Sequence, residues 1–247
     1  EEALSHSFSR FASKALGALG ATSGASFRGP VLLPPDCVAE FLVPQIISAA
    51  SARGVRLGRS PLGGKTGSPI AVSDLTLLEA GPGLSEFPLC PFDREGLKRV
   101  PRPLIENGIL QSLLYDTYEA RAAGQEATGN AIGGASSLPA IGAEAIEVAP
   151  GEHYQHDLAA MDRGIILTRF SGSTNPTSGD FSGVVKGGFL VEDGEARPIH
   201  ETTISGNIWT ALRQIDGISR EREVLYGTQS MPWIRIEDIS VSAGQAG

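Results

Sequence analysis

The chain has four histidines, the side chains best suited to acid–base chemistry near neutral pH. His153 and His156 lie three residues apart and could supply two ligands to a zinc ion, which needs at least a third ligand from the protein. Neither Cys37 nor Cys90 has another ligand at metal-binding spacing. Of the two interpretations, an incomplete zinc site and a solvated surface turn, the sequence favours the turn.

His200 and Glu201 begin like the H-E-x-x-H motif of zinc proteases, but the next three residues are Thr202, Thr203 and Ile204. The motif also needs a helix to bring two histidines onto one face, and this segment has the pattern of a strand. We therefore interpret the pair as partly buried side chains on a strand.

Two glycine-rich segments could bind a ligand through their backbone. Residues 63–66 (GGKT) end like a phosphate-binding P-loop, but position 59, where that motif requires glycine, is Arg59. A basic surface loop is the simpler interpretation. Residues 171–180 (SGSTNPTSGD) form a polar segment between predicted strands, where loops often carry binding residues. Composition alone fits a solvated loop equally well.

Composition and charge exclude some classes of function. The chain carries 20 Lys and Arg against 28 Asp and Glu, a net charge of −8, which argues against nucleic acid as the main partner because phosphate binding needs a basic face. No stretch approaches the ~18 apolar residues of a membrane-spanning helix. Two cysteines make no disulfide framework, and the first twenty residues do not resemble a signal peptide. We expect a cytoplasmic protein without a membrane partner.

The alternation of apolar residues and turn signals predicts a β-rich α+β fold, mainly antiparallel, with a few flanking helices. Asn107-Gly108 and Asp193-Gly194 are each flanked by β-like segments and predict two hairpins. Predicted strands cover 31–33, 75–78, 99–105, 109–115, 145–148, 164–170, 181–191, 196–203 and 233–241. Predicted helices cover 3–19, 118–123, 205–215 with Ser205 as N-cap, and a segment from Pro35 that buries Val38, Phe41, Leu42 and Ile46. Pro44 should kink or end that helix, and 53–67 should be a loop.

Ordered blocks of the sequence resemble the C-terminal domain of the TldD/TldE (PmbA) proteins, a family of two-subunit cytoplasmic peptidases. The blocks are CPFDREG (90–96), LIENGIL (104–110), LYDTYEAR (114–121), ATGNA (127–131), NPTSGDFS (175–182), GFLVEDGE (188–195), PIHETTISGN (198–207) and ISVSAG (239–244). The resemblance implies a C-terminal domain with a barrel-like sheet over residues 30–247. Residues 1–29 are then expected to be a helical lead-in from an N-terminal domain that is missing, as the absent initiator Met also suggests.

The resemblance also bears on metal binding. TldD subunits carry H-E-x-x-x-H on a helix, and a later cysteine completes their zinc site. In this chain the corresponding helix reads PDCVAEF (35–41), without histidine, and the later region reads TQSM (228–231), without cysteine. The resemblance therefore implies a TldE-like subunit with no metal ligand and no catalytic residue of its own. Its expected partner is a zinc-bearing TldD-like subunit or a second copy of itself.

Such a subunit would help enclose and bind small unfolded peptides while its partner supplies zinc. A β-rich domain can bind an extended peptide as an added strand at a sheet edge. Arg169, Asn175, Asp180 and His200 are the candidate contacts to substrate or partner.

Two alternatives remain open. One is a stand-alone or recruited hydrolase or biosynthetic enzyme that uses His153, His156 or His200 as acid–base groups. The other is a homodimeric peptide-binding module. The name "modulator of DNA gyrase" is also attached to the family, but the negative charge gives no support for direct contact with DNA.

Overall fold

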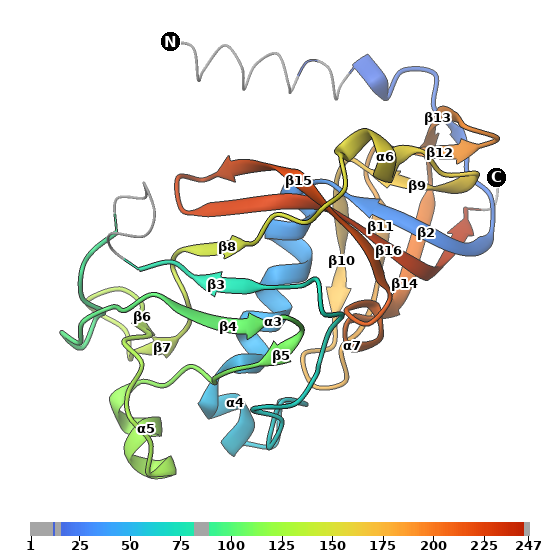
Figure 1. Ribbon diagram of the computed structural model, residues 1–247. Coiled ribbons are helices and arrows are strands. Elements are labelled where there is room, and N and C mark those ends of the chain that lie inside the picture. The colour runs from blue at the N-terminus through green and yellow to red at the C-terminus, as the bar shows by residue number, and fades with distance from the viewer. Residues whose placement is uncertain (1–11, 13–15, 82–88, 245–247) are drawn as a thin grey trace.

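The computed structural model describes residue 12 and residues 16–81 and 89–244 (Figure 1). Strands dominate, as predicted for the β-rich α+β class, and most of them join one large mixed sheet. The predicted helix over residues 3–19 falls largely outside the described residues, and the domain boundary at residue 30 stays a prediction. In the described part, no helix combines the length and apolar character needed to cross a bilayer.

The strands are β1 (Thr22–Ser23), β2 (Phe27–Leu33), β3 (Leu77–Glu79), β4 (Arg102–Glu106), β5 (Ile109–Leu110), β6 (Ala131–Ile132), β7 (Ala140–Ile141), β8 (Ile146–Val148), β9 (Arg163–Leu167), β10 (Phe170–Thr174), β11 (Asp180–Val185), β12 (Gly188–Glu192), β13 (Glu195–His200), β14 (Thr202–Asn207), β15 (Ile215–Leu225) and β16 (Gln229–Ala243). The helices are α2 (Pro35–Cys37), the π-helical turn η1 (Val38–Leu42), α3 (Val43–Ala50), α4 (Ala52–Arg56), α5 (Thr117–Ala123), α6 (Gln155–Ala159) and α7 (Ile208–Ala211).

The large sheet is open rather than closed into a barrel. Its main path runs β1-β13-β12-β9-β2-β16-β8-β3-β4-β5, and the two end strands do not pair with each other within the described residues. Strands β10, β11, β14 and β15 branch from this path, while β6 and β7 form a separate two-stranded sheet. Among the strands just named, only β1/β13, β2/β9 and β8/β16 pair in parallel, so the sheet is mainly antiparallel as predicted.

Strand β16 holds the sheet together, because it pairs with β15, β2, β14 and β8. Its apolar residues alternate with polar ones, and Ile234, Ile236, Ile239 and Val241 are buried in the main core. The pairing of β16 with β2 shifts register between Ile236 and Ile239, where Asp238 adopts a positive φ of 57°. This bulge lets one strand bend far enough to serve several partners.

The helix predicted from Pro35 is present and buries the expected face of Val38, Phe41, Leu42 and Ile46. It continues past Pro44 rather than ending there. Pro44 has no N–H for a helical bond, and the turn before it widens into the π-helical turn η1, where the Val43 N–H donates to the Val38 carbonyl. Figure 1 shows α3 behind β3–β5, and these elements share one core.

Both predicted hairpins are confirmed as β4–β5 and β12–β13, with positive φ at Asn107-Gly108 and Asp193-Gly194. The predicted helix at 205–215 is wrong: β14 runs to Asn207, and only Ile208–Ala211 is helical. The predicted single strand at 181–191 is two strands, β11 and β12, and residues 53–56 of the predicted loop belong to α4. Strand β15 was not predicted.

Candidate functional site

The helix to which the resemblance assigns metal ligands packs against β16. Helix α2 and η1 both contact this strand, which begins at Gln229 in the region of the later cysteine. Cys37 and Phe41 are buried and Glu40 is exposed, and Glu40 accepts a hydrogen bond from the Tyr226 hydroxyl in the β15–β16 turn. The two segments that would form the metal site are therefore neighbours here. Among residues 16–81 and 89–244, no three His, Cys, Asp or Glu side chains are grouped to hold a metal ion.

The polar segment 171–180 is part of the β10–β11 hairpin. The Asn175 side chain accepts hydrogen bonds from the backbone N–H groups of Thr177 and Ser178, at 2.9 and 3.2 Å. The Asp180 carboxylate accepts from the Ser178 hydroxyl at 2.7 Å and from the Asn207 amide at 2.9 Å. These hydrogen bonds, that from Asn207 first, lower the pKa of Asp180. Both predicted contact residues therefore organise the hairpin loop.

Asn207 joins this loop to α7. Its amide also donates to the Ser178 carbonyl at 2.8 Å, and its side-chain oxygen caps α7 by accepting from the N–H groups of Trp209 and Thr210. Gly179 has a positive φ of 84° and lies against Trp209, where a Cβ would be 2.4 Å from the indole nitrogen. The loop and the helix end thus form one polar corner.

The four predicted contact residues fall into two groups at opposite ends of this hairpin. Asn175 and Asp180 lie at the turn, whereas Arg169 precedes β10 and His200 ends β13 just before β14. Phe170 pairs with Val185, and Val185 pairs with Thr202. Arg169 and His200 therefore both lie toward the end of the hairpin opposite its turn. The structure therefore does not unite the four in one site.

The three candidate acid–base histidines are all exposed and lie on different elements. His153 forms an isolated parallel bridge with Ser219 beside β15, and His156, on α6, stacks on Tyr154 with ring centroids 5.5 Å apart. His200 and Glu201 are exposed rather than partly buried as predicted, and Glu201 lies between β13 and β14. The His200 Nδ1 atom lies 3.7 Å from the Glu201 carboxylate.

Strand β10 has a free edge, since its only strand partner in the described chain is β11. Ser171, Gly172 and Ser173 are exposed along it. On the inner face, the Phe170 ring packs against Phe41 of η1 with centroids 4.4 Å apart and covers Gly172 and its cross-strand partner Gly183. The edge strand is thereby fixed to the helix that contacts β16.

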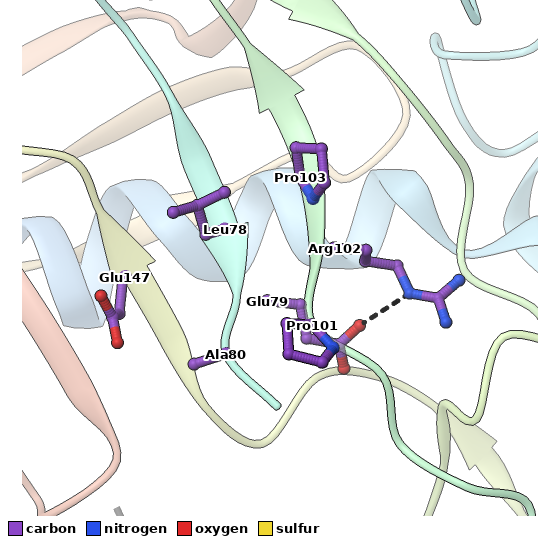
Figure 2. Close-up of a pocket in the computed structure, with 7 residues that line it drawn as sticks. All are labelled: Leu78, Glu79, Ala80, Pro101, Arg102, Pro103 and Glu147. Atoms are coloured by element: carbon purple, nitrogen blue, oxygen red, sulfur yellow. Dashed lines mark ion pairs between the residues drawn. The ribbon is translucent and has the colours of Figure 1, made fainter. Parts of the chain in front are cut away.

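A pocket of about 260 Å³ opens over β3, β4 and β8 (Figure 2). Leu78 lies opposite Pro103 in one neighbouring strand and opposite Glu147 in the other. Ala80 and Pro101 complete its mostly apolar wall, and Glu79 and Arg102 border it. Pockets with apolar walls and a few polar groups are common ligand sites.

The Glu79 carboxyl belongs to a buried polar network beside this pocket. It accepts a hydrogen bond from the Asn130 amide at 2.6 Å, and its other oxygen lies 3.6 Å from the Arg102 Nε. Arg102 also donates to the Thr128 carbonyl, and Asn130 donates to the Gly142 carbonyl. The network therefore fixes the segments around residues 128–130 and 142 to strands β3 and β4.

Burial raises the pKa of Glu79 to about 7, because the loss of water disfavours the charged carboxylate more than Arg102, Asn130 and Arg99 stabilise it. Glu144 raises it further. The carboxyl can exchange a proton near neutral pH, but the side chain is only 8% exposed. The geometry therefore assigns it an internal structural role.

This network was not predicted from the sequence. Leu75, Leu77 and Glu79 follow one another at every second position, and the first two are fully buried. A glutamate on the buried face of a strand needs partners, so the alternation could have marked Glu79. Nothing local could have indicated Asn130, which is 51 residues away in sequence.

Comparison with known proteins agrees with this fold. The family model for the PmbA/TldA metallopeptidase C-terminal domain matches residues 26–243. The metalloprotease PmbA of Escherichia coli O157:H7 is 29% identical over 86% of this chain and 45% of its own length. The chain spans about half the length of the curated relatives it matches.

Two solved structures share the architecture. TldE from Thermococcus kodakarensis superposes with a TM-score of 0.81 at 28% identity, covering 95% of this chain and 54% of that one. A Thermotoga maritima protein whose name describes it as a modulator of a DNA gyrase gives a TM-score of 0.82 at 29% identity, covering 92% and 53%. The chain therefore belongs to the PmbA/TldD metallopeptidase family, whose C-terminal domain it matches over residues 26–243.

Proposed function

We propose that this chain is a TldE-like subunit that contributes a peptide-binding wall to a two-subunit peptidase, while a zinc-bearing TldD-like partner supplies the catalytic metal. The observation that carries the proposal is the free edge of β10 beside the helix that contacts β16. An extended peptide can pair with such an edge through main-chain hydrogen bonds, which give affinity with little dependence on sequence.

The exposed residues of β10 suit this role. Ser171, Gly172 and Ser173 are small, so an approaching peptide backbone meets no bulky side chain along the edge. Phe170 and Phe41 hold the strand from the core side. The edge is therefore open and firmly supported, as a docking strand needs to be.

The assignment of metal to the partner rests on residue types. The helix segment 35–41 contains no histidine, and residues 228–231 contain no cysteine. A catalytic zinc needs three protein ligands to hold the ion and to lower the pKa of its bound water. The similarity to TldE from Thermococcus kodakarensis supports the assignment of this chain as TldE-like.

The test compares the chain alone with the complex that co-purifies from its native host. We expect zinc and peptide cleavage in the complex, and neither in the isolated chain. Stoichiometric zinc with peptide cleavage by the isolated chain would refute the proposal in favour of an independent enzyme.

Edge pairing is tested with two unstructured peptides of identical sequence, N-methylated at odd or at even positions. A strand uses every second N–H on a given side, so one pattern should abolish cleavage by the complex and the other should spare it. Equal loss with both patterns would argue against strand pairing.

Asn175→Ala and Asp180→Ala should each slow cleavage by disordering the loop that ends β10. Glu195→Ala, an exposed substitution on β13, is the control. Thermal unfolding of each variant separates a local effect from loss of the fold, and unchanged turnover would exclude a role for this loop.

A further inference from the structure

A second pocket, of about 370 Å³, lies between α4, α5 and the segment at Leu138, away from β10. Arg53 and Arg56 line it from α4, Tyr118 and Glu119 from α5. The proposed peptide edge does not use these residues. Tyr118 and Glu119 lie in the block LYDTYEAR (114–121), to which the resemblance assigns no role.

The carboxylates of this pocket are all engaged internally. Both oxygens of Glu119 accept hydrogen bonds from Arg56, at 2.7 and 2.8 Å, and the side chain is only 3% exposed. Both oxygens of Glu95 accept from Thr117, each at 2.8 Å. Asp116 is buried and caps α5 by accepting from the Glu119 N–H. An incoming ligand therefore finds these acids already hydrogen-bonded.

The arginines, in contrast, keep free donors at the surface. Arg56 binds Glu119 through Nε and Nη2, which leaves Nη1, and its side chain is 45% exposed. Its guanidinium lies over the Tyr118 ring at 5.8 Å, which limits its motion. Arg53 is exposed, and within the described ranges its guanidinium makes no hydrogen bond or ion pair. Two guanidinium groups on one helix face thus offer donors to an anion.

Large apolar side chains are exposed at the same pocket. Tyr118 is 68% exposed and Leu138 is 85% exposed. Exposed apolar groups that border a hollow are typical of binding surfaces. The pocket therefore combines an anion-binding side with an apolar side.

We propose that this pocket binds the C-terminal carboxylate of a peptide, with Arg53 and Arg56 holding the carboxylate and Leu138 and Tyr118 contacting the last apolar side chain. The choice of a peptide as ligand rests on the proposed function. Edge binding at β10 and terminus binding at α4–α5 would then be separate contacts to peptide.

The test is calorimetric titration of the 247-residue chain with N-acetyl-Ala-Ala-Leu and with its C-terminal amide. Charge-assisted hydrogen bonds predict that the free acid binds at least about tenfold more tightly than the amide. Arg53→Gln should remove most of that difference, and Leu138→Ser should weaken both ligands. Arg213→Gln, at an exposed arginine that does not line the pocket, is the matched control and should change neither.

Equal affinity for acid and amide, binding of neither, or an unchanged preference in Arg53→Gln would overturn the inference. Acetate that competes as well as the tripeptide would show a simple anion site and would overturn the peptide assignment. Thermal unfolding of the variants confirms that each is folded. These titrations need no partner and no turnover, so they can fail while the N-methyl peptide test still supports the proposed function.

Discussion

Replacing Glu79 with glutamine should stabilise the protein increasingly as pH rises. Glu79 has a pKa of about 7 in the folded chain against an ordinary value of 4.5, and loss of water around the carboxylate is the main cause. Between these pH values the native state binds a proton that the unfolded state has released. The stability contributed by Glu79 is thus fully present below pH 4.5 and is lost as pH rises through about 7. The amide that replaces the carboxyl in the variant does not titrate.

The magnitude follows from that pKa difference. The interval from 4.5 to about 7, at about 1.4 kcal/mol per pH unit, corresponds to about 3 kcal/mol. The free energy of unfolding of Glu79→Gln minus that of wild type should therefore increase by about 3 kcal/mol between about pH 4.5 and 8. Taking the difference cancels the titration of groups shared by both proteins.

Urea unfolding at steps of half a pH unit measures this difference. The two proteins are fitted with one shared m-value, the dependence of the unfolding free energy on urea concentration. Glu106→Gln, which makes the same change at an exposed position on the strand next to β3, is the control. A flat difference for Glu79→Gln would refute the argument from burial. A difference that decreases with pH would show that the Arg102 ion pair at 3.6 Å outweighs desolvation.

Two further substitutions test how the hairpin beside α7 is built. Gly183→Ala should destabilise the fold by about 1–3 kcal/mol, because the new Cβ would lie 2.5 Å from both the Gly172 Cα and the Phe170 ring. Thermal unfolding measures this loss, and Ser182→Ala, at an exposed position on the same strand, is the control. Equal stability of the two variants would contradict the packing argument. Asn207→Ala should lower the free energy of unfolding by about 1–2 kcal/mol, because the α7 cap is lost. Ser205→Ala should leave the free energy of unfolding in urea nearly unchanged. A larger loss in Ser205→Ala than in Asn207→Ala would show that Ser205 is the cap.

The parts of the fold that were predicted correctly depend on local chemistry. Asn107-Gly108 and Asp193-Gly194 accept positive φ and so specify tight turns wherever the rest of the chain lies. The errors occur where distant partners decide. Residues 205–207 were predicted as helix, but β14 forms because β11 and β16 flank it on both sides. Strand β15 was missed because a bulge between Ile218 and Arg222 breaks its alternation.

The candidate sites show the same division. Of the segment 171–180 predicted as a loop, only residues 175–179 lie between strands, because residues 171–174 belong to β10 and Asp180 begins β11. The hydrogen bonds that join Asn175 to Ser178 and Asp180 to Asn207 could not be inferred from composition. The Glu79 network joins residues 79, 102 and 130 through the sheet. Its members share no spacing in sequence, so only the fold brings them together.

Strand β16 has a consequence for the order in which the molecule can assemble during synthesis. Its partners β2, β8, β14 and β15 all precede it along the chain. Until β16 leaves the ribosome, each of these strands lacks one neighbour, and the apolar residues that its isoleucines cover stay in water. The sheet is therefore completed only after the whole of β16 has left the ribosome, in a late and cooperative step. Nascent chains stalled before β16 should be the ones that require chaperones.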